Sequence, residues 1–398
     1  MKKFLSSLPA RLVFSIIIGI TVGCISNASV MQIVVTIQNI LGSLIFFCVP
    51  LIIIGFIAPS ITKLGNDVSK VLLLAVGLAY VSSIGAAFMS AFGGLEIIPH
   101  LKISSPIAES EEVPKIIFNL GLTPILSVMN ALVLSILIGV AVICTKSTAT
   151  ANLLEEFHKI VLSIVTKVIT PILPLFVAFT FCSLAYEGVI TKQLPIFVKV
   201  VLIVIIGHYI WLTVLYTIAA VYSRKSPLRV LKYYAPAYFT ALGTMSSAAT
   251  LPVALESARK SDVLRKDMVD FGIPFFANTH VCGSILTEVF FVMIVSQVYY
   301  GALPSLETMI MFCLLLGVFA VGAPGVPGGT VIGSLGLITG VLGFDGNAVA
   351  LVISIFALQD SFGTACNITG DGALTLILSK FVDGNKNDVV DIKPDTFN

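Results

Sequence analysis

Residues 351–378 read LVISIFALQDSFGTACNITGDGALTLIL, an apolar run long enough to cross a membrane as a helix. Four polar residues interrupt the run at intervals of four, three and four positions: Asp360, Thr364, Asn367 and Asp371. At 3.6 residues per turn, their side chains fall on one narrow stripe of the helix. We therefore predict a transmembrane helix with one polar face.

Two carboxylates on this face need partners, because an ionised carboxylate at the centre of a span costs about 3 kcal/mol or more. A bound cation and the ammonium group of a substrate would both serve. The alternatives are protonation of both carboxyls, or pairing with basic side chains of another helix. Basic residues are scarce in the predicted spans, which favours a binding site.

The rest of the chain has the composition of a membrane protein. Its 398 residues are 57% hydrophobic and 11% charged, whereas soluble proteins average about 25% charged residues. The apolar residues are spread along the whole chain, which excludes a soluble domain with one anchor. A net charge of +2 without a basic stripe argues against a nucleic-acid partner. The predicted fold class is an all-α polytopic membrane protein, surrounded by lipid.

Eight segments are long and apolar enough to span a bilayer. They are residues 11–30, 33–62, 68–94, 116–145, 157–186, 195–223, 272–299 and 346–381. Basic residues gather near the N-terminus, around residue 225 and in 259–266. The positive-inside rule therefore places both termini in the cytoplasm. We expect the chain in the plasma (inner) membrane. We interpret the apolar run before Cys24 as a first span rather than a cleaved signal peptide.

Two segments break the apolar pattern in the same way. Residues 243–252 read GTMSSAATLP, and residues 322–330 read GAPGVPGGT. Within a membrane, open backbone is tolerated only where it is buried in protein or lines a cavity. A matched pair of interrupted apolar segments is typical of the binding site of a transporter. We predict two re-entrant helical hairpins, with ordinary loops between short spans as the alternative.

A third polar segment, residues 274–284, reads PFFANTHVCGS. Its His280 can carry a proton near neutral pH, or can be neutral and bonded to a carbonyl. The seven cysteines stand singly and predict neither a disulfide framework nor a zinc site. No metal-protease motif or nucleophile–base pair is present, so an enzyme is not expected. An intramembrane enzyme and a ligand-gated channel remain the alternatives outside transport.

Together these segments resemble the dicarboxylate/amino acid:cation symporter family, which contains the glutamate transporters. In that family the first hairpin tip reads SSSGTLP, where residues 246–252 read SSAATLP. The last helix follows DxxRTxxNxxGD, where residues 360–371 read DSFGTACNITGD. Order, spacing and span count are similar over nearly the whole chain.

The resemblance implies an elevator-type homotrimer with eight spans and two re-entrant hairpins. Within residues 1–225, spans 1, 2, 4 and 5 would form a scaffold that holds the trimer together. Spans 68–94 and 195–223 would belong to the moving transport domain, and residues 226–385 would form its core.

The resemblance also implies roles for individual residues. Asp360 would bind a substrate amino group, and Asp371 a sodium ion with the help of Asn367. The implied substrate-binding residues are Ser246, Ser247, Val326, Gly328, Asp360, Gly363, Thr364 and Asn367. The implied cation-binding residues are Asn367, Asp371, Ser82, Ser83, Asn278 and His280, the last as a proton carrier. No cofactor is implied apart from the transported cation, Na⁺ or H⁺.

Two departures from the family pattern bear on function. Gly363 stands where members that carry acidic substrates have an arginine, the side chain suited to bidentate carboxylate recognition. This favours a small neutral amino acid such as serine, threonine or alanine over a dicarboxylate or acidic amino acid. Residues 280–283 read His-Val-Cys-Gly in place of the family's Asn-Met-Asp-Gly. Because hard cations prefer oxygen ligands, we expect fewer coupled sodium ions, or a proton at His280.

Overall fold

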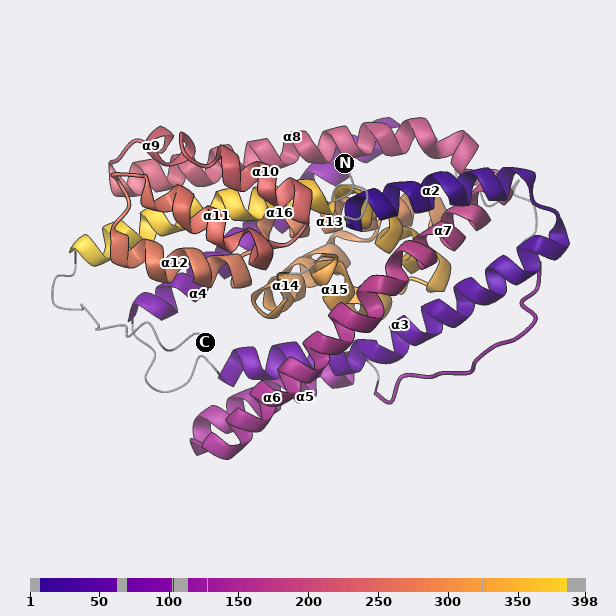
Figure 1. The fold of residues 1–398 in the computed structure, drawn as a ribbon, viewed down its shortest axis with the longest axis horizontal. Coiled ribbons are helices and arrows are strands. Elements are labelled where there is room, and N and C mark those ends of the chain that lie inside the picture. The colour runs from indigo at the N-terminus through magenta and orange to yellow at the C-terminus, as the bar shows by residue number, and fades with distance from the viewer. Residues whose placement is uncertain are drawn as a thin grey trace.

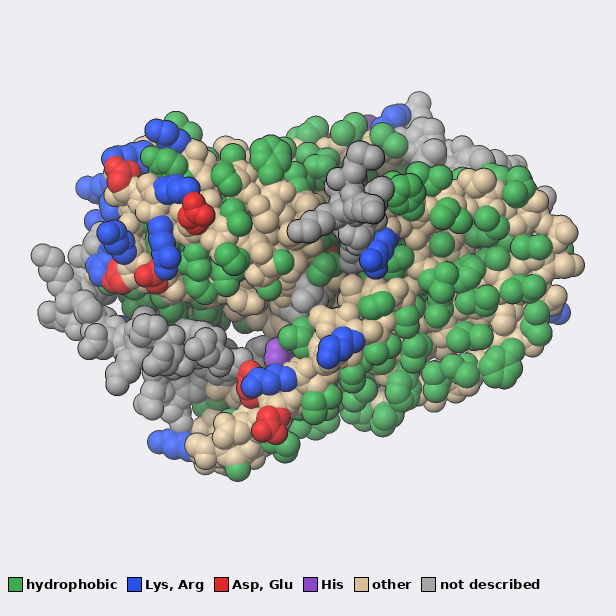
Figure 2. Space-filling model, viewed as in Figure 1, with side chains coloured by type: hydrophobic (Ala, Val, Ile, Leu, Met, Phe, Trp, Pro, Cys, Tyr) green, Lys and Arg blue, Asp and Glu red, His purple; other side chains and the backbone are tan. Residues whose placement is uncertain are grey.

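The computed structural model describes residues 8–62, 70–101, 103, 114–126, 128–323, 325 and 327–384. All regular secondary structure within these residues is helical, and no strand occurs among them (Figure 1). Hydrophobic side chains are spread over much of the surface in view, whereas Lys and Arg gather mainly at one end (Figure 2). This surface is that of a protein embedded in lipid.

One group of helices comes from the first half of the chain. It contains α2 (Leu8–Ile25), α3 (Ala28–Thr62), α5 (Val128–Thr145), α6 (Thr148–Ile164) and α7 (Thr170–Tyr186). A π-helical turn, η3 (Val165–Ile169), joins α6 to α7. The helix α2 packs along α7, and α3 packs against α5, α6 and α7. These long helices lie side by side in Figure 1.

A second group surrounds the C-terminal helix. The helices α13 (Cys282–Tyr300) and α16 (Gly346–Gly384) pack on each other at its centre. Around them lie α4 (Lys70–Ile97), which ends in the short η1 (Ile98–Leu101), α8 (Val189–Ser223), α9 (Leu228–Leu231) and α12 (Lys266–Thr279). In the most apolar part of each span, 94% of α12–α13 and 83% of α16 is buried, against 33% of α8. The polar stripe of α16 therefore lies inside the protein.

Both interrupted segments form helical hairpins. The first consists of α10 (Ala235–Thr244) and α11 (Ser247–Arg259), and the second of α14 (Leu306–Gly322) and α15 (Gly329–Gly340). None of these helices reaches the roughly 20 residues that a full crossing requires. Each break has a local cause. Met245 and Gly328 adopt left-handed backbone conformations, and the Ser246 hydroxyl caps α11 by accepting a hydrogen bond from Ala249 N–H.

Three predicted spans are interrupted in the structure. Residues 11–30 run across the break at Ser26 and Asn27, because α2 ends at Ile25 and α3 begins at Ala28. Residues 116–145 are not one helix, because 114–126 is irregular, with a left-handed Gly121, and α5 begins only at Val128. Residues 272–299 are not continuous either, because the helix begins at Lys266 and breaks at His280 and Val281. Six stretches of the described residues are long and apolar enough to cross a membrane. The count of eight spans stays a prediction.

Candidate functional site

The four polar residues of the α16 stripe are all buried. Asp360 and Thr364 are each 4% exposed, Asn367 is 2% exposed, and Asp371 is fully enclosed. Their partners come from the second hairpin, from α13 and from the break between α12 and α13. The helix therefore presents its polar face to segments that are distant in sequence.

The tips of the two hairpins meet beside Asp360. The Ser246 hydroxyl donates to the Gly325 carbonyl at 2.7 Å, and Ala248 N–H donates to the same carbonyl at 3.3 Å. Gly328 N–H, from the other side of the second tip, donates to Asp360 Oδ2 at 2.7 Å. The predicted substrate residues Ser246, Gly328 and Asp360 are thus brought together. Val326 lies outside the described residues.

Asn367 holds the start of α13. Its Oδ1 accepts hydrogen bonds from Gly283 N–H at 2.7 Å and from Ser284 N–H at 3.3 Å, and its Nδ2 donates to Ser284 Oγ at 3.0 Å. The amide thereby satisfies backbone donors that every helix leaves free at its N-terminus. In this arrangement the Asn367 side chain is engaged with α13.

Small residues allow α13 and α16 to touch directly. A Cβ added at Gly283 would lie 2.5 Å from both the Gly363 carbonyl oxygen and the Cys366 Cβ. A Cβ at Gly363 would lie 3.2 Å from Ser284 Cα and N. A side chain at position 363 would therefore press on the start of α13. The resemblance places the arginine of acidic-substrate members at this position, and a side chain here would require Ser284 to shift by a few tenths of an ångström.

His280 links three elements at the break between α12 and α13. Its Nδ1 lies 2.9 Å from Asp371 Oδ1, and its Nε2 lies 2.8 Å from Ser82 Oγ on α4. His280 and Asp371 are both fully buried. The second carboxylate oxygen of Asp371 has no hydrogen-bond partner among the described residues. The imidazole therefore stands between two residues that the family resemblance assigns to cations.

The remaining predicted cation-binding residues, Ser83 and Asn278, differ in burial. Ser83 is fully buried, and its hydroxyl has no partner within the described part of the chain. Asn278 is exposed, and its Nδ2 donates to the Pro274 carbonyl of its own helix at 2.8 Å. Asn278 is thus bonded within α12 rather than to the His280–Asp371 pair.

Further buried polar residues lie on α13, α15 and α16. The sequence already favours a polar interior for Glu288, whereas Ser334 and Gln359 were not predicted. Glu288 of α13 is fully enclosed, and its Oε1 accepts a hydrogen bond from Ser334 of α15. Neither Glu288 Oε2 nor the amide atoms of the fully buried Gln359 have partners among the described residues. A glutamine directly before Asp360 in an otherwise apolar run was the available signal.

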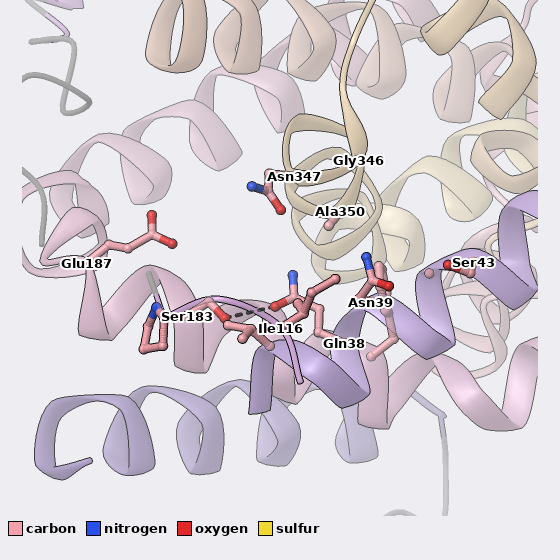
Figure 3. A pocket seen from close by; sticks show the side chains of 13 residues that line it. Gln38, Asn39, Ser43, Ile116, Ser183, Glu187, Gly346, Asn347 and Ala350 are labelled. Atoms are coloured by element: carbon pink, nitrogen blue, oxygen red, sulfur yellow. Dashed lines mark hydrogen bonds between the residues drawn. The ribbon is translucent and has the colours of Figure 1, made fainter. Parts of the chain in front are cut away.

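A cavity of about 420 Å³ lies away from the stripe, between α3, α7 and the start of α16 (Figure 3). Within it the Ser183 hydroxyl donates to Gln38 Oε1 at 2.8 Å. Glu187, at the junction of α7 and α8, also lines it, and burial raises the pKa of its carboxyl to about 7. Gly346, Asn347 and Ala350 are the α16 residues that reach it, so it does not include the site around Asp360 and Asp371.

A membrane-embedded bundle with two broken hairpins around a buried polar stripe is typical of secondary transporters. A sequence model of the sodium:dicarboxylate symporter family matches residues 8–381, and the chain belongs to this family. The family consists of multi-pass membrane symporters rather than enzymes.

Its relatives include transporters named for different substrates. The chain is 27% identical to excitatory amino acid transporter 2 of Mus musculus over 278 residues, which is 68% of this chain and 48% of the relative. It is 28% identical to the human neutral amino acid transporter B(0) over 186 residues, 46% of this chain and 34% of that relative. The matched part of the chain thus spans half or less of the length of either relative.

Proposed function

We propose that this protein is a symporter that carries a small neutral amino acid across the plasma membrane, with a proton at His280 as a coupling cation. The observation that carries this proposal is the buried His280 imidazole, within 2.9 Å of Asp371 and 2.8 Å of Ser82. An imidazolium can supply the positive charge that a buried carboxylate requires, without any metal ion.

The two hydrogen bonds of His280 persist in both protonation states. In the neutral ring, Nδ1–H donates to Asp371 while the Ser82 hydroxyl donates to Nε2. In the charged ring, Nε2–H donates to Ser82 Oγ instead, and the hydroxyl turns. The site can therefore load and release a proton without rearranging its backbone. Cys282, where the family has an aspartate, removes one oxygen ligand for sodium.

On the substrate side, Asp360 supplies a carboxylate for the ammonium group of an amino acid. Backbone N–H groups at the hairpin tips and the hydroxyl of Ser247 would hold its carboxylate. Gly363 supplies no positive charge for an acidic side chain of the substrate, and its contact with Ser284 crowds any larger residue at this position. These features favour alanine, serine or threonine over glutamate. Thr364, one helical turn from Asp360, would complete the pocket.

An elevator movement in a homotrimer is the mechanism that we propose for the fold. The helices α4, α8 and α12 pack on the α13–α16 pair and would move with it and with both hairpins. The helices α2, α3, α5, α6 and α7 pack chiefly on one another and would form the fixed scaffold. Both termini would lie in the cytoplasm, as the distribution of basic residues predicts.

The test is uptake by the purified protein in liposomes with imposed gradients. We expect an inward proton gradient, without sodium, to drive accumulation of alanine, serine or threonine. His280→Asn should flatten the pH dependence while binding of the amino acid persists. His208→Asn is the matched control, since His208 is also buried but bonds to Gly283 O and Thr287 Oγ1. Uptake driven only by sodium, with an unchanged pH profile in His280→Asn, contradicts proton coupling.

A dicarboxylate or acidic amino acid is the second candidate substrate, because the family is described as sodium:dicarboxylate symporters. Such a substrate needs a basic group that replaces the arginine missing at Gly363. Competition by succinate or aspartate against bound alanine distinguishes the two candidates. Strong competition would favour the acidic substrate and overturn the neutral assignment.

A further inference from the structure

A second cavity, of about 620 Å³, opens beside the transport site but does not include it. It lies between α8, the α9–α10 segment and Thr369 of α16. Its lining is mostly apolar and aromatic, with Leu212, Leu228, Leu231 and Phe239 among the wall residues. Leu228 and Phe239 are each 69% exposed, so the mouth of the cavity is apolar as well. In a membrane protein such a groove faces lipid tails.

Tyrosine hydroxyls lie at the edge and on the floor of this groove. Tyr209 and Tyr238 join α8 to α10 through a hydrogen bond of 2.9 Å between their hydroxyls. On the floor, the Tyr216 hydroxyl donates to the Thr369 carbonyl at 2.8 Å. The Tyr234 hydroxyl is buried and has no partner among the described residues. The groove thus lies between two helices that each pack on α16 and that are joined to each other by the Tyr209–Tyr238 hydrogen bond.

Positive charge is concentrated next to the groove. Arg224, Lys225, Arg229 and Lys232 lie within nine residues that contain no acidic side chain. They flank or lie among Leu228 and Leu231, which line the groove. Figure 2 shows Lys and Arg side chains gathered at the end of the molecule where Figure 1 places α9. The positive-inside rule assigns this end to the cytoplasm.

Within the described residues, two of these four cations form no ion pair and no hydrogen bond to a carboxylate or carbonyl. Arg229 forms a salt bridge with Asp262, and Lys225 Nζ donates to the Val263 carbonyl at 3.0 Å. Arg224 and Lys232 are exposed, and neither pairs with a carboxylate within the described residues. Lys232 Nζ lies over the ring of Tyr233, 5.5 Å from its centroid, and neutral rings leave its charge in place. An apolar groove with two cations that have no carboxylate partner in the described part of the chain matches a ligand with an apolar tail and an anionic head.

We propose that this groove binds an anionic phospholipid of the cytoplasmic leaflet. One acyl chain occupies the cavity between α8 and α10, and the phosphate lies at Arg224 and Lys232. Any lipid tail fits an apolar groove within a bilayer, so the two cations determine which lipid is retained. Basic residues near the membrane surface attract anionic lipids for the same reason.

The bound lipid would also stabilise the packing of α16 near Asp371. A Cβ added at Gly372 would lie 2.7 Å from the Tyr216 hydroxyl and 3.0 Å from the ring of Tyr234. These two tyrosines therefore separate the groove from the segment of α16 that carries Asp371. An acyl chain against their outer faces would hold them in contact with that segment.

The first experiment compares two phospholipids with the same acyl chains, phosphatidylglycerol and phosphatidylcholine, added to the delipidated protein in detergent. Bound lipid is counted by native mass spectrometry, and stability is followed as the unfolding temperature. We expect phosphatidylglycerol to bind and stabilise more strongly than phosphatidylcholine. Equal effects of the two lipids overturn the proposal. Oleate that acts as well as phosphatidylglycerol also overturns it, because the occupant is then a fatty acid.

Variants locate the lipid on the protein. Arg224→Gln with Lys232→Gln should weaken phosphatidylglycerol binding about 30-fold, as expected for two lost charges. Lys146→Gln with Lys159→Gln is the matched control, because it removes two charges at α6 and its preceding turn, far from α9 in Figure 1. Thr213→Trp should fill the groove and prevent binding with all charges present. Undiminished binding in both groove variants overturns the proposal. No amino acid or ion gradient is involved, so the result is independent of the transport assay.

Discussion

The helices α8 and α16 are similar in length, with 35 and 39 residues, and both are apolar enough to cross a membrane. They differ in what surrounds them. Along its most apolar stretch α8 is 33% buried and shows Ile206, Ile210 and Ile218 on its surface, whereas α16 is 83% buried. Hydropathy therefore identifies both as spans, but it does not distinguish a helix that faces lipid from one that faces protein.

Polar side chains make that distinction. Asp360, Asn367 and Asp371 of α16 are bonded to the second hairpin, to α13 and to His280 respectively. The few polar groups of α8 that are buried point the same way, as His208 bonds to α13 and Tyr216 to α16. A polar side chain that bonds to another helix thus marks the face that contacts protein. The exposed Thr213 and Thr217 of α8 bond instead to backbone carbonyls of their own helix.

The largest effect in this comparison is expected for Asp360→Asn. The variant keeps the shape of the side chain and its bond to Gly328 N–H, but it removes the charge that we assign to the substrate ammonium group. Loss of one partner of a buried charge pair costs several kcal/mol, so binding of a neutral amino acid should weaken about 100-fold. Isothermal titration with alanine or serine measures this. Unchanged affinity would separate Asp360 from the substrate.

The second prediction concerns the contact between α13 and α16. Gly283→Ala places a methyl group 2.5 Å from the Gly363 carbonyl and the Cys366 Cβ, so the helices must move apart. Overpacking of this kind typically costs about 1–3 kcal/mol. Gly333→Ala in α15 is the control, since its Cβ meets nothing within 4 Å. The unfolding temperature should fall in the first variant alone, and equal changes in both would contradict the close approach.

Much of this architecture could be predicted from the sequence, and the reasons are local. The α16 stripe follows from helical periodicity, and both hairpins follow from small residues and prolines in apolar segments. The irregular chain before Val128 was missed because residues 116–126 are apolar enough to pass for part of a span. The pairing of His280 with Ser82 could not be predicted from spacing, because 198 positions separate them. Gln359 and Ser334 were missed because single amides and hydroxyls in apolar runs are usually satisfied locally.

The third prediction concerns Glu187, a partly buried carboxyl outside the α16 stripe, and the pH dependence of stability that it causes. Burial raises the pKa of Glu187 to about 7, from 4.5 in the absence of the fold. The folded protein therefore holds this proton more tightly, and its stability should decline as the pH rises from about 4.5 to about 7 and stay level above that. Other buried carboxyls contribute in the same direction, so Glu187→Gln should make the decline shallower rather than remove it. The variant should stabilise the protein above pH 7 by about 1–2 kcal/mol, allowing for partial solvent screening.

Thermal unfolding of the wild type and Glu187→Gln across pH 4.5 to 8 measures this dependence. Glu256→Gln serves as the control, because Glu256 is exposed and pairs with Lys260 at the surface of α11. It should leave the decline between pH 4.5 and 7 in place. The same decline in Glu187→Gln would assign the pH dependence to another group.

The smallest expected change in stability comes from a comparison of two tyrosines on opposite sides of α8. Tyr216→Phe deletes the hydroxyl that donates to the Thr369 carbonyl of α16 at 2.8 Å, a buried bond worth about 1 kcal/mol. Tyr222→Phe makes the same chemical change on an exposed tyrosine of α8 and should alter stability by less than about 0.5 kcal/mol. Unfolding temperatures of the two variants, measured in the same detergent, give the comparison. The inward face of α8 is attached to α16 by specific bonds and the outward face is not, so only Tyr216→Phe should lower the unfolding temperature. Equal losses in both variants would mean that the hydroxyls of α8 contribute through the surrounding detergent or lipid rather than through α16.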